Sequence, residues 1–145
     1  MSAVPYYPML IDLRGRVCLV VGGGPEAERK TAGLVGSGVN VTVVAQQLAG
    51  TLEPMAELGS FRWLKRSFET SDLDGVFFVV AADEDMDVNR QVAEAARERD
   101  LLCAVPADPS LGTVSIPGLL QQGKLTLTVD TAGASSYMAG RIQNE

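Results

Sequence analysis

The sequence contains no histidine among its 145 residues. This excludes catalysis by a Ser-His-Asp triad or a Cys-His pair, and it excludes a histidine-ligated metal. A proton that moves during a reaction must use Asp, Glu, Lys, Tyr, Cys or water. There are two cysteines, Cys18 and Cys103, and each lies in an apolar run without C-x-x-C spacing. We therefore predict core thiols in a reducing cytoplasm, and no bound metal.

Basic residues and long apolar runs are also scarce. Twelve Lys and Arg stand against eighteen Asp and Glu, which gives a formal net charge of -6. A nucleic-acid-binding protein normally presents a basic face, so we expect no nucleic-acid partner. No apolar run approaches the ~20 residues of a membrane span, and the chain does not open like a signal peptide. We expect no membrane association and a cytoplasmic protein.

Hydrophobic residues make up 46% of the chain, enough for one domain with a buried core. Continuous apolar runs rich in β-branched residues indicate strands buried on both faces, and segments with helical spacing lie between them. Strands that alternate with helices predict a parallel sheet, which right-handed crossovers wind into a doubly wound, Rossmann-like α/β fold. We predict strands over 16–21, 39–45, 61–64, 76–82 and 101–105, and helices over 25–37, 51–58 and 87–99.

The pattern changes near Leu111. Residues 124–131 alternate between apolar and polar, which predicts a strand with one exposed face, and 135–144 could form a helix. A lone strand leaves an unpaired edge that usually needs a partner, so we expect a homodimer. We divide the chain into a Rossmann-like domain over 1–111 and a smaller dimerisation segment over 112–145.

A glycine-rich turn follows the first predicted strand and opens the first predicted helix. The pattern is G-x-G-x-x-A. Its first glycine permits a tight turn, the second lets the backbone approach a pyrophosphate, and the small third residue packs helix against strand. The helix N-terminus then offers free N–H groups to phosphates. A turn without a ligand could use the same residues, but the strand–turn–helix context favours a dinucleotide site. The residues are Gly22-Gly23-Gly24-Pro25-Glu26-Ala27.

The acidic residue that commonly holds the adenine ribose is missing. The second predicted strand ends at Ala45-Gln46-Gln47-Leu48. Gln46 or Gln47 could hydrogen-bond a ribose hydroxyl as neutral substitutes, or both could be ordinary surface residues. No Arg or Lys lies nearby to pair with a 2′-phosphate, which favours NAD over NADP.

The glycine turn belongs to a longer pattern that resembles the precorrin-2 dehydrogenases, which also form the N-terminal module of siroheme synthases. The resemblance spans nearly all of the chain, and its most specific part is the glycine run followed by Ala27-Glu28-Arg29-Lys30. Further matching stretches are Tyr7–Arg16, Val41–Ala45, Ala81–Asp85, Val88–Arg90, Ile116-Pro117 and Val129–Ser135.

The resemblance implies an NAD-dependent enzyme that oxidises precorrin-2 to sirohydrochlorin in sirohaem or related tetrapyrrole biosynthesis. Some members also insert ferrous iron. Because members continue into a helical domain and dimerise, we expect segment 112–145 to be incomplete. By position, the resemblance implies nucleotide contacts from Pro25, Glu26, Gln46, Gln47, Ala82 and Asp83. Precorrin-2 carries many carboxylates, for which the basic candidates are Arg14, Arg29, Lys30, Arg90, Lys124 and Arg141.

The sequence departs from the family where an acid/base is expected. The family has V-D-D-P or V-D-x-P there, and its first aspartate is the proposed acid/base. This chain reads Val105-Pro106-Ala107-Asp108-Pro109, so the family position is Ala107, which cannot move a proton. Asp108 could substitute through a local shift, or could merely cap the turn. The alternative function is therefore a sirohydrochlorin-binding, ferrochelatase or NAD-binding module that has lost the dehydrogenase acid/base.

An acidic run, Asp83-Glu84-Asp85 with Asp87, follows the third buried strand. Carboxylates bind hard cations, but the run lacks the spacing and the glycine of a calcium loop. We favour an acidic turn at a helix N-terminus, close to the nicotinamide end of a bound dinucleotide.

Overall fold

The computed structural model describes residues 6–122 and 124–129. They belong to two compact units, one formed by Ile11–Val114 and one formed by the residues before and after that range. The first unit contains β1 (Val17–Val21), α1 (Pro25–Val35), β2 (Asn40–Val44), α2 (Leu52–Glu57), β3 (Arg62–Leu64), a 3₁₀ helix (Thr70–Leu73), β4 (Phe78–Ala81), α3 (Met86–Glu98), β5 (Leu102–Ala104) and a second 3₁₀ helix (Pro109–Leu111).

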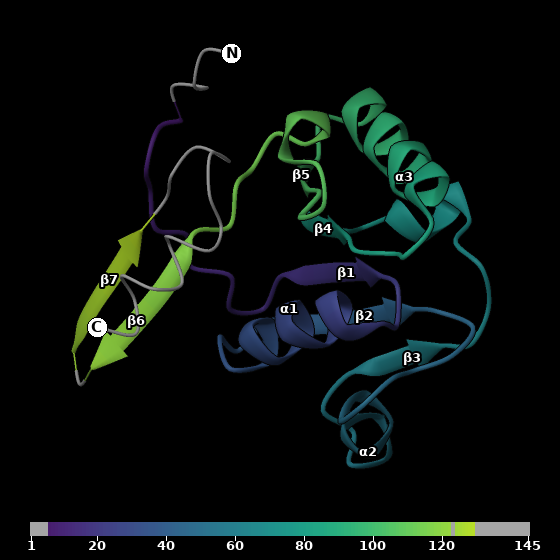
Figure 1. The fold of residues 1–145 in the computed structure, drawn as a ribbon, viewed down its shortest axis with the longest axis horizontal. Coiled ribbons are helices and arrows are strands. Elements are labelled where there is room, and N and C mark those ends of the chain that lie inside the picture. Colours follow the sequence, from purple (N-terminus) through teal and green to yellow (C-terminus); the bar gives the residue numbers. More distant parts are fainter. Residues whose placement is uncertain (1–5, 123, 130–145) are drawn as a thin grey trace. The chain divides into compact units, whose positions relative to one another are not determined.

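The five strands of the first unit form one parallel sheet in the order β3-β2-β1-β4-β5 (Figure 1). The chain builds the sheet outward from β1 in one direction, through β2 and β3, and then returns to add β4 on the other side of β1. In doubly wound folds, ligands bind at the carboxyl ends of the strands beside such a reversal of strand order. The predicted Rossmann-like α/β fold is confirmed.

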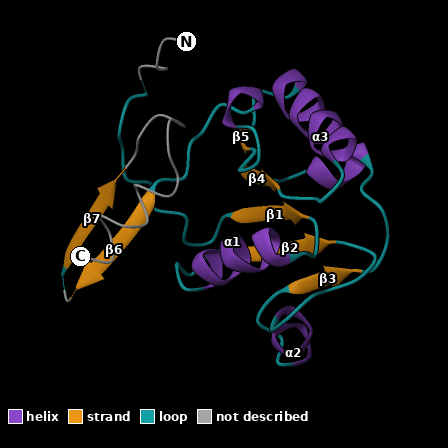
Figure 2. Cartoon of the chain, in the orientation of Figure 1, coloured by secondary structure: helices purple, strands orange, loops and turns teal. Residues whose placement is uncertain are grey.

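Helices cover both faces of this sheet (Figure 2). Alternate residues of β1 enter separate cores, because successive side chains of a strand point to opposite faces. Cys18 and Val20 belong to the cluster that includes residues of α1 and α2, whereas Leu19 and Val21 belong to the cluster that includes residues of α3. Each of these four side chains is at most 1% exposed. The continuous apolar run of β1 is thus explained by burial on both faces.

The second unit contains a feature that the sequence interpretation missed. β6 (Gly118–Gln122) pairs antiparallel with β7 (Leu125–Val129), so the expectation of a lone strand over 124–131 was wrong. β6 was not recognised because Leu119-Leu120-Gln121-Gln122 does not alternate, and glycines at 118 and 123 made the segment resemble a turn. The predicted helix over 135–144 lies outside the described residues. The division at residue 111 into an NAD-binding domain and a dimerisation segment stays a prediction.

Within the described residues, the helices are all too short or too polar to cross a bilayer. The segment over 112–117 contains no strand. Its start is instead held to β5, because the amides of Thr113 and Val114 both donate to the carbonyl of Cys103, over 2.8 and 3.1 Å. Burial raises the pKa of each buried thiol, Cys18 and Cys103, to about 11.

Candidate functional site

The first two glycines of the turn are required by the neighbouring backbone. Gly22 has a φ of +124°, and a Cβ there would overlap the carbonyl of Ala82, at the end of β4. A Cβ on Gly23 would overlap the carbonyl oxygen of Gln47, beyond the end of β2. The carbonyl of Gly23 also accepts the amide of Ala49 over 2.7 Å. Gly22 and Gly23 therefore lie between the residues that follow β4 and those that follow β2, with no room for a side chain at either position.

Gly24 has different surroundings. A Cβ there would meet the flexible carboxylate of Glu84 rather than any backbone atom. Gly24 is the N-cap of α1, and Pro25 follows it at the first helical position. The amides of Glu26 and Ala27 lie in the first turn, where N–H groups have no carbonyl partner within the helix. Gly24 thus leaves the positive end of α1 open to an anion.

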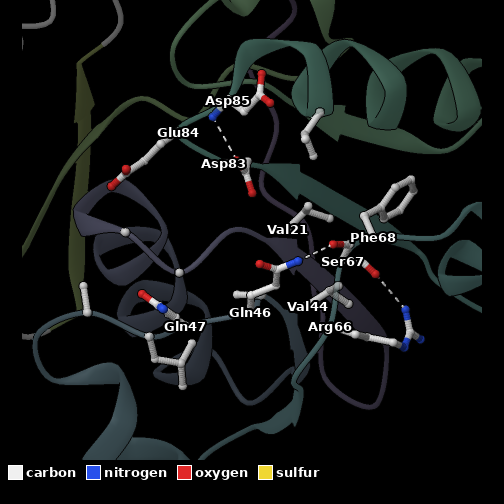
Figure 3. Close-up of a pocket in the computed structure, with 16 residues that line it drawn as sticks. Val21, Val44, Gln46, Gln47, Arg66, Ser67, Phe68, Asp83, Glu84 and Asp85 are labelled. Carbon is white, nitrogen blue, oxygen red and sulfur yellow. Dashed lines mark hydrogen bonds between the residues drawn. The ribbon is translucent and has the colours of Figure 1, made fainter.

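A cleft of about 700 Å³ opens beside this turn, at the carboxyl ends of the parallel strands (Figure 3). Such a volume is typical of small-molecule and cofactor sites. Five of the predicted contact residues line it, namely Gly23, Gly24, Gln46, Gln47 and Asp83. The remaining lining residues are Val21, Val44, Ala45, Leu48, Ala49, Arg66, Ser67, Phe68, Glu84, Asp85 and Val88.

Four predicted contact residues do not line the cleft. Gly22 and Ala82 are buried behind it, against each other. Pro25 is exposed at the start of α1 and has no N–H to offer. The carboxylate of Glu26 pairs with basic side chains one turn along the same helix, Arg29 and Lys30, so only its amide belongs to the open helix end.

One wall of the cleft is formed where β2 and β3 end. The amide nitrogen of Gln46 donates to the hydroxyl of Ser67 over 2.7 Å, which leaves the amide oxygen of Gln46 as an acceptor (Figure 3). The indole of Trp63 donates to the carbonyl of Ala45 over 2.8 Å and holds the end of β2 in place. This wall therefore offers a hydrogen-bond acceptor where dinucleotide sites commonly carry a carboxylate.

The same wall contains a cation that the sequence interpretation did not foresee. The expectation that no Arg or Lys lies near Gln46 was wrong, because β3 pairs with β2 in the register Val44↔Leu64 and brings Arg66 to the cleft. The guanidinium of Arg66 forms two hydrogen bonds with Asp72 and lowers the pKa of that carboxyl. Arg66 was not recognised because it lies far from β2 in the sequence. The predicted strand over 61–64, which ends two residues before Arg66, was the signal that could have located it.

The opposite wall is the turn between β4 and α3. The buried side chain of Asn89 accepts the amide of Asp83 and donates to its carbonyl, both over 2.9 Å. The carboxylate of Asp83 accepts the amide of Asp85, whose carboxylate in turn accepts the amide of Asp87 and caps α3. The described residues hold no group of three acidic or thiol side chains able to bind a metal ion. The carboxylates of Asp83 and Asp85 instead stabilise the turn itself.

The predicted acid/base lies outside the cleft. Asp108 follows β5, and its carboxylate accepts the hydroxyl of Ser110 over 2.6 Å rather than any backbone amide. Within the described chain, neither Asp108 nor the exposed Ala107 lines the cleft. The role of Asp108 as acid/base therefore stays a prediction.

The predicted carboxylate-binding cations are largely paired with acidic side chains of this chain. Arg14 contacts Asp12 over 2.8 Å, and Arg90 contacts Asp87 over 3.0 Å. Arg29 and Lys30 both pair with Glu26, Lys124 is exposed in the second unit, and Arg141 lies outside the described residues. A role of these groups in substrate binding stays a prediction.

Comparison with known proteins gives consistent matches. A family model described as "Putative NAD(P)-binding" matches residues 9–118. The siroheme synthase of Sodalis glossinidius is 36% identical over 140 residues, and that of Methylobacillus flagellatus is 38% identical over 136 residues. These alignments cover 97% and 94% of this chain but only 30% and 29% of the two relatives. The chain thus spans less than a third of these relatives.

A solved structure of a precorrin-2 dehydrogenase matches over 96% of this chain and 68% of that one, with a TM-score of 0.83 and 33% sequence identity. A tRNA N6-threonylcarbamoyladenosine dehydratase from E. coli matches over 63% of this chain, with a TM-score of 0.54 and 12% identity, a likeness of fold alone. The coverage and identity of the first structure, together with the family model, establish the relationship. The chain belongs to the family of precorrin-2 dehydrogenases and siroheme synthase N-terminal modules, built on an NAD(P)-binding domain.

Proposed function

We propose that this chain binds NAD and uses it to oxidise precorrin-2 to sirohydrochlorin in sirohaem or related tetrapyrrole biosynthesis. The observation that carries the proposal is the position of Gly24, which is the N-cap of α1 and lines a cleft at the switch point of the sheet. The names of the matched proteins supply the substrate class.

The residues of the cleft fit the parts of NAD. The amides of Glu26 and Ala27 would hold the pyrophosphate, because they carry N–H groups and no Cβ on Gly24 blocks the approach. The amide oxygen of Gln46 would accept a ribose hydroxyl. Asp83, on the opposite wall, would meet the nicotinamide end. NAD supplies the hydride acceptor, and the chain's own residues bind and orient the two reactants.

We propose Asp108 as the group that holds or moves the proton. It lies beyond the end of β5, which pairs with β4, the strand that ends at Ala81 and leads into Asp83. One carboxylate oxygen accepts the hydroxyl of Ser110, and catalytic hydrogen bonds commonly form only when the substrate is bound.

The test is NADH formation by the purified chain with precorrin-2 and NAD⁺, with Asp108→Ala measured in parallel. We expect Asp108→Ala to lower kcat by about 100-fold or more with little change in NAD⁺ affinity. Asp74→Ala, which changes an exposed carboxylate outside the cleft, should keep wild-type rates. A chain that binds NAD⁺ but forms no sirohydrochlorin would overturn the dehydrogenase function.

Ala107 favours one alternative, a sirohydrochlorin-binding, ferrochelatase or NAD-binding module without dehydrogenase activity. Ala107→Asp separates the two functions. A large gain in oxidation rate would show that the natural site is degenerate. An unchanged rate would leave Asp108, or chemistry without a protein base, as the explanation.

We propose that the protein is a cytoplasmic homodimer. Its two buried thiols suit a reducing compartment. A two-stranded sheet such as β6–β7 is marginal alone in water, and Tyr7, Met9 and Leu10 in the same unit are 82%, 66% and 86% exposed. Light scattering at micromolar concentration should report twice the chain mass, and Leu10→Glu should shift the species toward monomer. A wild-type monomer would overturn the dimer.

A further inference from the structure

The charges that line the cleft are mostly negative. Asp83, Glu84 and Asp85 contribute three carboxylate side chains, and Arg66 is the single cation among the described lining residues. A dinucleotide with a 2′-phosphate brings additional negative charge to such a cleft. Whether that phosphate can pair with a cation depends on which groups Arg66 already contacts.

The guanidinium of Arg66 is committed to neighbouring acceptors. One terminal nitrogen donates to Asp72 over 2.9 Å and to the carbonyl of Ser67 over 3.1 Å, and the other donates to the second carboxylate oxygen of Asp72. Three of its five N–H donors are therefore used. The carboxylate of Glu69 lies 3.9 Å away, so two negative groups face one positive group.

Asp72 is itself firmly placed. Its side chain is 4% exposed, and one of its oxygens also accepts the amide of Glu69 over 2.8 Å. In Figure 3 the side chain of Arg66 extends away from Gln46, on the far side of Ser67. The positive charge thus lies next to the end of β2, where a ribose would bind, but is turned toward Asp72.

We propose that Asp72 is a specificity-determining residue that selects NAD against NADP by holding Arg66. With Asp72 ionised, the Arg66–Asp72 pair carries no net charge and the guanidinium is held away from a 2′-phosphate, whereas the acceptor oxygen of Gln46 suits a free ribose hydroxyl. Without Asp72, Arg66 can turn toward the cleft and pair with a phosphate through two parallel hydrogen bonds. This inference rests on the proposed dinucleotide site, and it concerns the adenosine end rather than the oxidation.

A purely structural role for the Arg66–Asp72 pair would tie the end of β3 to the following 3₁₀ helix. Loss of such a tie would weaken both dinucleotides alike. The ratio of the two dissociation constants therefore separates the roles, because a general loosening of the cleft does not change it.

The experiment measures the dissociation constants of NAD⁺ and NADP⁺ for the full chain by calorimetry, for wild type, Asp72→Asn, Arg66→Gln and the double variant. Asn keeps the size of Asp72 and an oxygen for the amide of Glu69. We expect Asp72→Asn to improve NADP⁺ binding relative to NAD⁺ by about tenfold, and Arg66→Gln to abolish that gain. Asp74→Asn, which removes the exposed partner of Arg99, should leave the ratio unchanged.

A folded Asp72→Asn chain with the wild-type ratio would overturn the proposal. Should that variant fail to fold, Asp72→Ser is measured in the same way, with and without Arg66→Gln. A gain in relative NADP⁺ affinity that Arg66→Gln abolishes supports the proposal, and an unchanged ratio overturns it. If wild type binds neither dinucleotide, the proposed function fails as well; if it binds NAD⁺ and only the ratios disagree, the inference alone fails.

Discussion

Two turns at the same edge of the sheet each connect a strand to a helix, but different interactions hold them in place. The turn between β1 and α1 runs through Gly22, Gly23 and Gly24, whereas the turn between β4 and α3 contains Asp83 and Asp85. The two strands are direct neighbours, and each turn leads into a helix. The first turn is shaped by neighbouring backbone that leaves no room for a Cβ, and the second is held by side-chain hydrogen bonds.

The difference explains which turn can hold an anion. Side chains that satisfy the amides of the acidic turn leave fewer donors for a ligand, and they carry negative charge. The glycine turn has no side chains and no side-chain cap on α1, so its amides remain for phosphates. The glycines that let this turn pack against neighbouring backbone therefore also leave its own amides available as hydrogen-bond donors.

The largest expected effect is on the glycine turn. Gly22→Ala should destabilise the fold by about 3 kcal/mol or more, because φ is +124° and the new Cβ overlaps the carbonyl of Ala82. Denaturant unfolding measures this. Gly33→Ala is the control: its Cβ in α1 would meet nothing within 4 Å, so we expect about 0.5–1 kcal/mol of stabilisation. Equal stability of wild type and Gly22→Ala would break the comparison.

The acidic turn should depend on Asn89. Asn89→Leu removes both hydrogen bonds to the backbone of Asp83 inside a fully buried site, and we expect a loss of about 2–3 kcal/mol. Hydrogen exchange at the amide of Asp83 should accelerate as well. Asn40→Ala, at an exposed position of β2, should change stability by less than about 0.5 kcal/mol. Unchanged protection of Asp83 in the Leu variant would contradict the assigned role.

Acidic pH should lower the free energy of unfolding, because two carboxyl groups near the glycine turn and the cleft have lowered pKa values. The amide and hydroxyl of Thr51 lower the pKa of Glu28, and Arg66 lowers the pKa of Asp72. A carboxyl with a lower pKa in the folded state contributes full stability above its unfolded pKa, about 4. That contribution is lost as pH falls through the lowered value. Urea unfolding between pH 6 and about 3 should show this decline, and Glu28→Gln should make it shallower. Stability that rises toward acid would contradict the assignment.

The smallest expected effect is at a buried hydroxyl of α1, the helix that the glycine turn begins. Among the described residues, Thr31 in α1 is 0% exposed and its hydroxyl has no hydrogen-bond partner. Thr31→Val keeps the shape and removes the unsatisfied group, so we expect about 1 kcal/mol of stabilisation. Thr113→Val is the opposite case, because its hydroxyl accepts the amide of Cys103 over 3.1 Å, and it should destabilise. Thermal unfolding distinguishes the two signs.

Local pattern was sufficient for the strands and helices of the sheet domain, because the apolar runs and the glycine turn carry their own signals. It also placed Gln46 and Asp83 at the cleft, since the carboxyl ends of parallel strands share one edge. It failed for β6, whose sequence does not alternate between apolar and polar residues, and for Arg66, which lies twenty positions after Gln46. A polar contact of that kind depends on which strands pair, which no local pattern contains.

The sequence by itself determined the fold class, the turn that begins α1, the family and the departure from the family pattern at Ala107. Those properties follow from hydrophobic periodicity and from short motifs, which are local along the chain. Only the tertiary structure decided that neighbouring backbone excludes a Cβ at Gly22 and Gly23 but not at Gly24, and that Asp72 holds the one cation of the described lining. The physical reason is that both depend on atoms from other strands, and strand order brings those atoms together.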